Sequence, residues 1–130
     1  MTGPRPQAPP LLLIQIAMIL GVLMFAGATW FAHSQQAFTR ATLPQGIQYA
    51  LPVLCVLALS GIAFVRRMRA AVTDLPQFAT LSLIGWAFGE GAALAGCVYY
   101  WLTNDPTWAL AGIVVMLVGV VMLPAAYPRS

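Results

Sequence analysis

Four long stretches of apolar residues run along the chain, separated by short segments that hold most of its polar residues, prolines and arginines. The stretches cover residues 11–32, 47–65, 78–102 and 108–123. Each comes near the roughly 20 residues that a helix needs to cross a hydrocarbon core of about 30 Å. The pattern predicts an all-α integral membrane protein with four transmembrane helices, and the short connections predict an up-down bundle.

A single transmembrane domain is expected over residues 11–124, after a proline-rich leader at 1–10 and before a short tail at 125–130. Proline suits the first turn of a helix, as at the end of this leader. Pro52 is the one proline well inside a stretch, where it either kinks the second helix or lies in its first turn. Cleavage of the first stretch as a signal peptide is an alternative, because residues 26–28 read AGA. The long apolar core behind a single arginine favours a retained helix.

The arginines predict the orientation, since short cytoplasmic loops carry an excess of basic residues. With four spans, one side holds Arg5, Arg66, Arg67, Arg69 and Arg129, against Arg40 alone on the other. Both termini are therefore expected in the cytoplasm, in a multi-pass protein of the inner, cytoplasmic membrane. Aromatic residues are expected at the outer boundary, where amphipathic rings prefer to lie: Trp30, Phe31, Tyr49, Tyr99, Tyr100, Trp101 and Trp108. Trp86 is the tryptophan out of place.

Composition excludes several function classes. Hydrophobic residues make up 61% of the chain and charged residues 7%, which indicates a lipid environment. The arginines lie in termini and loops, so we expect no nucleic-acid partner. Without a CxxC pair, a histidine cluster, a glycine-rich phosphate loop or a nucleophile elbow, we expect no metal, nucleotide or other cofactor. Cys55 and Cys97 are expected at depths in the bilayer that differ by about 9 to 10 Å, which is too far for a disulfide. His33, at the outer end of the first helix, is expected to be an interfacial residue.

Glu90 is the one acidic residue inside an apolar stretch, because the other two, Asp74 and Asp105, lie in connections. A charge at the bilayer centre costs about 2.5–3.5 kcal/mol, so such a residue is functional or else is protonated and hydrogen-bonded inside a bundle. If the first two helices pack beside it, Gln15 and Ser60 are its best candidate polar partners. Small residues on the same helix predict a groove for close helix packing, here named the small-residue groove: Gly85, Gly89, Ala93 and Gly96.

The segment around Glu90 resembles a known family. "AFGEGAALAGCV", residues 87–98, is similar to the second helix of the proteolipid subunit c of F-type ATP synthases, in which the essential carboxylate lies in an AF-x-E-x5-G-x-V setting. The resemblance covers this helix and not the rest of the chain, and it also fits small bacterial four-helix membrane proteins that share such a segment. It implies that Glu90 is a proton- or sodium-binding carboxylate.

Two function classes remain open. We favour an accessory or structural subunit of a larger membrane complex, because one carboxylate and abundant small-residue faces describe packing better than chemistry. Its partners would be the lipid bilayer and other membrane subunits, or further copies of the chain. The alternative is an ion-handling subunit or small channel that uses Glu90. We do not expect an enzyme, because no second catalytic group can be named beside Glu90.

Overall fold

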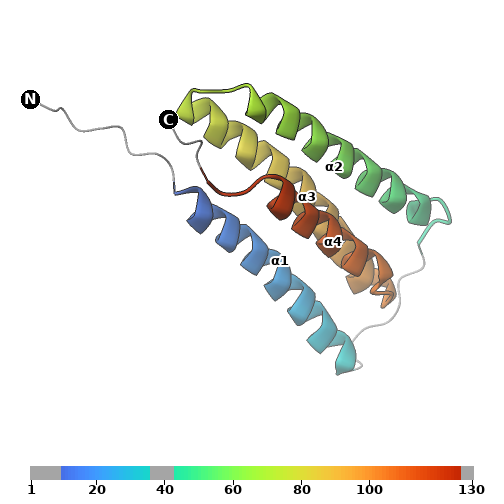
Figure 1. Ribbon diagram of the computed structural model, residues 1–130. Coiled ribbons are helices and arrows are strands. Elements are labelled where there is room, and N and C mark those ends of the chain that lie inside the picture. The colour runs from blue at the N-terminus through green and yellow to red at the C-terminus, as the bar shows by residue number, and fades with distance from the viewer. Residues whose placement is uncertain (1–9, 36–42, 127–130) are drawn as a thin grey trace, which may run out of the picture.

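The computed structural model describes residues 10–35 and 43–126, and this part of the chain forms four helices, α1 to α4 (Figure 1). They are α1 (Leu11–Ser34), α2 (Ile47–Ala70), α3 (Leu75–Thr103) and α4 (Thr107–Met122). Successive helices run in opposite directions, which brings the ends of α1 and α3 to the same end of the bundle. The predicted all-helical fold with four helices is confirmed. The leader at 1–9, the tail beyond 126 and the arginines at 5, 40 and 129 lie outside the described residues.

Three of the helices, α1, α2 and α3, are long and apolar enough to cross a membrane. Helix α4 has 16 residues and a length of about 24 Å, which is less than the ~30 Å of a hydrocarbon core. Helix α2 runs five residues past its predicted end and so includes Arg66, Arg67 and Arg69 in its last turns. Basic side chains suit a helix C-terminus, whose exposed carbonyl groups carry partial negative charge. Pro52 lies inside α2, beyond its first turn.

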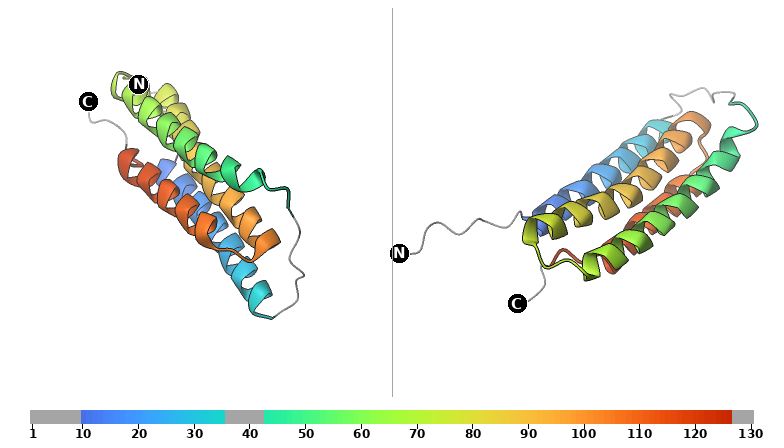
Figure 2. Two further views of the ribbon diagram at one scale, coloured as in Figure 1. Left: turned by 90° about the vertical axis from the view of Figure 1, so that its right-hand side faces the viewer. Right: turned by 90° about the horizontal axis from the view of Figure 1, so that it is seen from above.

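Helix α3 is the centre of the bundle and contacts each of the other three helices. Helix α4 pairs most extensively with α3, whereas α1 and α2 contact both α3 and α4 but not each other. Figure 2 shows α1 and α2 at opposite edges of the bundle. In lipid, where no hydrophobic force drives helices together, close packing of small residues decides which helices pair. The pairing of α3 with α4 follows this rule.

Helix α4 lies in the small-residue groove of α3, backbone against backbone. A Cβ added at Gly89 would lie 3.0 Å from Cα of Met116. A Cβ at Gly112 of α4 would lie 2.5 Å from the carbonyl oxygen of Ala92 and 2.6 Å from Cα of Ala93. No side chain fits at these positions without displacing backbone atoms. Helices α1 and α2 also contact α3, and Val65 of α2 lies 3.1 Å from a Cβ added at Gly85, but α4 makes the closest approach to the groove.

The connection between α3 and α4 is a tight turn. Asn104 caps α3 in the left-handed region with φ of 60°, a conformation that asparagine tolerates better than most residues. The carboxylate of Asp105 accepts hydrogen bonds from the backbone N–H and the side-chain hydroxyl of Thr107, at 3.1 and 2.7 Å. These bonds satisfy a donor at the start of α4 and lower the pKa of Asp105 from its ordinary value.

The other end of α4 is held by donors from α2 and α3. The indole N–H of Trp86 donates to the carbonyl oxygen of Leu123 at 2.9 Å, and a guanidinium N–H of Arg69 donates to the carbonyl oxygen of Pro124. The last carbonyl groups of a helix have no partner within it, and in lipid each needs a donor from the protein. Trp86 and Arg69 therefore supply donors from α3 and α2 to the carbonyl groups just past the end of α4.

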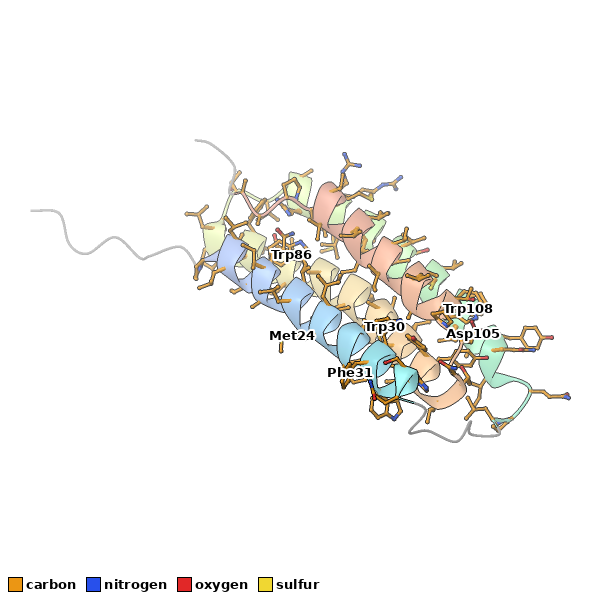
Figure 3. The ribbon with its side chains drawn as sticks, turned by 90° about the horizontal axis from the view of Figure 1, so that it is seen from below. Met24, Trp30, Phe31, Trp86, Asp105 and Trp108 are labelled. Carbon is orange, nitrogen blue, oxygen red and sulfur yellow. The ribbon has the colours of Figure 1, made fainter. Side chains whose placement is uncertain are left out.

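Side chains at the opposite end of the bundle are rich in aromatic rings. Figure 3 shows Trp30, Phe31 and Trp108 there, with Trp86 nearer the end that carries the arginines of α2. Such a separation of rings and arginines is typical of the two boundaries of a membrane protein.

Candidate functional site

Glu90 lies about midway along α3, on the side of that helix that faces α1, and is half-buried. It follows Trp86 by one turn, so the two side chains lie one above the other. The position results directly from the sequence, because the apolar stretch that contains Glu90 forms one uninterrupted helix. The only carboxyl group within a helix of the described residues is thus placed where α1, α3 and α4 meet.

A small pocket surrounds Glu90, with room for about one water molecule. Glu90 and Gln15 are its two polar side chains with unused hydrogen-bonding groups, and the remaining walls are apolar apart from the Trp86 N–H. The lining residues are Gln15, Met18 and Ile19 from α1, Trp86 and Glu90 from α3, and Met116 and Val120 from α4. The pocket therefore combines one carboxyl group and one amide in an otherwise apolar environment.

Gln15 is the polar residue that the fold brings to Glu90. Its side chain is 6% exposed, and its Nε2 has no hydrogen-bond partner among the described residues. Leaving a buried donor without a partner costs about 1–3 kcal/mol. A water molecule or an oxygen-bearing occupant of the pocket would satisfy this donor, and the carboxyl group of Glu90 stands at the same pocket.

Ser60, the other candidate partner, is not brought to this pocket. It is exposed on α2, and α1 and α2 do not contact each other. The sequence placed Ser60 at a suitable depth but carried no information on which side of α3 the second helix would pack. Of the two candidate polar partners, Gln15 lines the same pocket as Glu90 and Ser60 does not.

Trp86 is the functional-site residue whose role the sequence did not show. Its ring is 4% exposed and forms a wall of the Glu90 pocket, and Figure 3 shows it between α1 and α4. Because its N–H already bonds to Leu123, it offers no donor to Glu90. The sequence carried one signal of this role, because Trp86 is far along the chain from the aromatic residues expected at the outer boundary. A tryptophan buried within a bundle needs a hydrogen-bond partner for its indole N–H.

The chemistry open to this site is limited. No group of three or more histidine, cysteine, aspartate or glutamate residues that could hold a metal ion occurs in residues 10–35 and 43–126. Two polar side chains supply too few oxygen atoms for calcium or magnesium. Cys55 and Cys97 are free thiols. What remains is the binding of a proton, a water molecule or a poorly coordinated monovalent cation.

Contacts at the aromatic end hold α1 in place over this pocket. A ring nitrogen of His33, Nε2, lies 3.0 Å from the carbonyl oxygen of Trp101, and the imidazole stacks on Tyr100 with ring centres 5.3 Å apart. His33, expected as an interfacial residue, thus connects the last turn of α1 to the last turns of α3. The connection matters because α1 buries few residues against the bundle: Leu11, Gln15, Val22 and Thr29.

One face of α3 has no helix against it. Gly91 lies on the side of α3 opposite Gly89, because two residues advance a helix by about 200°. A Cβ added at Gly91 would meet nothing within 4 Å, whereas Gly89 packs against α4. We name the exposed stripe the open face of α3; it consists of Ile84, Ala87, Gly91 and Val98, and at its edge the ring of Phe88 lies against Gly61 of α2.

Comparison with protein-family models, curated proteins and solved structures gives no match to this chain.

Proposed function

We propose that the chain is a four-span protein of the inner, cytoplasmic membrane with both termini in the cytoplasm. Support comes from the arginines in the last turns of α2, which favour the cytoplasmic side for the end of the bundle where α1 begins and α4 ends. Residues 123–126 extend the short α4, and Trp86 and Arg69 bond to their carbonyl groups.

In this membrane the chain serves as an accessory or structural subunit of a larger complex. The observation that carries this proposal is the open face of α3, because the central helix of the bundle is left uncovered along one side. Ala87 and Gly91 are small residues one turn apart there, a spacing that lets the backbone of another helix approach closely. The small-residue groove cannot serve this purpose, since α4 fills it.

The partner is another membrane subunit or a second copy of the chain, and purification in mild detergent separates these outcomes. Replacing Gly91 by leucine should release the partner while the released chain stays folded, because the new side chain enters open space within the chain. Gly21→Leu on α1 is the matched control, since a Cβ at Gly21 also meets nothing within 4 Å. A complex that survives Gly91→Leu unchanged would contradict the proposed docking face.

A second candidate function is ion handling by Glu90, and the Gln15 donor beside it is the observation that favours this role. A carboxyl group next to a buried, unpaired amide in an apolar pocket can exchange a proton or hold a hydrated monovalent cation. The resemblance to subunit c implies the same chemistry. We do not propose an enzymatic activity, because Glu90 is the only titratable side chain that lines the pocket.

A further inference from the structure

A second cavity lies at the arginine-bearing end of the bundle, away from the Glu90 pocket. Its volume is about 230 Å³ and it opens to the surroundings of the protein. Two arginines of α2, Arg66 and Arg69, supply its charge. The other walls are mainly apolar and include Val72, Phe78, Met122 and Leu123. The cavity is therefore lined by two positively charged side chains and by apolar surface.

Arg69 is buried, and no carboxylate of residues 10–35 and 43–126 neutralises its charge. The side chain is 9% exposed and its guanidinium lies 4.1 Å from the centre of the Phe78 ring. One η nitrogen donates to the carbonyl oxygens of Pro124 and Ala126, and the other, Nη1, has no partner among the described residues. A buried charge is costly unless an opposite charge compensates it. Within the described part of the chain, the guanidinium thus has an unused donor and no anion beside it.

Arg66 adds a second positive charge at the mouth of the same cavity. It is exposed, unlike Arg69, and lies three residues before it on the same face of α2. Arg67, which follows it, is equally exposed but does not line the cavity. Two arginines that line one cavity suit the oxygen atoms of a phosphate group, which a guanidinium group binds in a bidentate manner.

A membrane contains anionic lipids, which have both a negatively charged phosphate group for the arginines and apolar chains for the apolar walls. Helix α2 is long and apolar enough to span, and these arginines occupy its last turns, at the depth where lipid headgroups lie. Basic pockets between membrane helices bind the headgroups of anionic lipids on the cytoplasmic side. The apolar walls at Met122 and Leu123 suit the glycerol and upper acyl chains of such a lipid.

We propose that the cavity between α2 and the end of α4 binds the phosphate group of an anionic phospholipid through Arg66 and Arg69. The bound lipid also stabilises the end of α4, because Arg69 holds the lipid phosphate and the carbonyl groups of Pro124 and Ala126 together. This site is independent of the open face of α3 and of Glu90.

Native mass spectrometry of the detergent-solubilised chain, titrated with a short-chain phosphatidylglycerol, measures this binding. Short-chain phosphatidylcholine and sodium phosphate are titrated in parallel. We expect one phosphatidylglycerol per chain, bound at least about fivefold more tightly than phosphatidylcholine. Arg66→Ala should weaken it about fivefold, and Arg67→Ala, which removes the same charge one residue away, should leave it unchanged.

Three results would overturn the proposal. Equal affinity for the two lipids would show that the lipid charge is not recognised. Equal weakening by Arg66→Ala and Arg67→Ala would assign the binding to general attraction by the basic end of α2. Displacement of phosphatidylglycerol by an equal concentration of sodium phosphate would assign the cavity to free phosphate instead of a lipid. Both variants keep Arg69, so loss of the α4 contact does not confuse the comparison.

Discussion

The indole N–H of Trp86 donates a 2.9 Å hydrogen bond to the carbonyl oxygen of Leu123, which joins α3 to the end of α4. The two residues are 37 positions apart, and both are buried. The bond gives a partner to the carbonyl group that follows the end of this 16-residue helix, which has none within the helix itself. It also fixes the wall of the Glu90 pocket, because the same indole lines that pocket.

Replacing Trp86 by phenylalanine should destabilise the bundle by about 1–3 kcal/mol, because the buried carbonyl group of Leu123 loses its donor. Reversible unfolding in detergent, followed by circular dichroism, measures the change. Trp108→Phe is the control, since Trp108 lies half-exposed at the aromatic boundary. Equal stability of the two variants would show that the hydrogen bond contributes nothing.

Leucine at Gly89 should cost at least about 1–3 kcal/mol, because the new side chain meets the backbone of α4 at Met116. Leucine at Gly91, two residues away on the same helix, should leave the stability of the isolated chain unchanged or slightly raised, since glycine is a poor helix former. Thermal unfolding of the purified chain compares them. If Gly91→Leu proves as damaging as Gly89→Leu, the assignment of the two faces of α3 is wrong.

Glu90→Gln should leave insertion, thermal stability and partner retention intact, because glutamine keeps the length and hydrogen-bonding capacity of the side chain without its charge. Ser60→Ala, at an exposed position on α2, serves as the control. Proton and sodium flux into proteoliposomes is the measurement that separates the two candidate functions. Unchanged flux agrees with the accessory subunit, whereas loss of all translocation in an intact complex would establish the ion-handling role.

The hydrogen bonds of Asp105 in the turn between α3 and α4 should make a small contribution to stability that depends on pH. Its folded-state pKa is lowered, chiefly by the hydrogen bond from the Thr107 side chain, so the stabilisation is present above the ordinary aspartate value of about 4. It is lost as the pH falls through the lower folded-state pKa. Unfolding midpoints measured between pH 3 and 7 should show this loss in the wild type and not in Asp105→Asn. Identical pH profiles would exclude a role for the carboxylate.

The four-span topology predicts opposite accessibility for the two ends of the bundle. A cysteine placed at Ala71, after α2, should react with a membrane-impermeant thiol reagent from the cytoplasmic side only. A cysteine at Gln45, before α2, should react from the outside, and both positions are exposed. Cys55 and Cys97 are first replaced by alanine to remove background labelling. Labelling of both positions from one side would contradict the topology.

The sequence alone determined the helices, because each is encoded by a local run of apolar residues, and three of these runs are long enough to cross a membrane. Observed boundaries differ from the predicted ones mainly at α2, where the arginines of the last turns continue the helix instead of ending it. The sequence also singled out Glu90, since one carboxyl group in an apolar stretch is visible without any knowledge of its neighbours. The small-residue groove was visible for the same reason, as a local spacing of glycine and alanine.

Only the tertiary structure decided which elements meet. Nothing in the spacing of Gly85, Gly89, Ala93 and Gly96 identified α4 as the helix in the groove, because that choice depends on the complementary Gly112 of a distant segment. The same choice left Ser60 exposed, brought Gln15 to Glu90 and gave Trp86 its acceptor at Leu123. Apolar periodicity assigns residues to helices, whereas contacts between helices in lipid depend on matching shapes and on polar groups that must find partners.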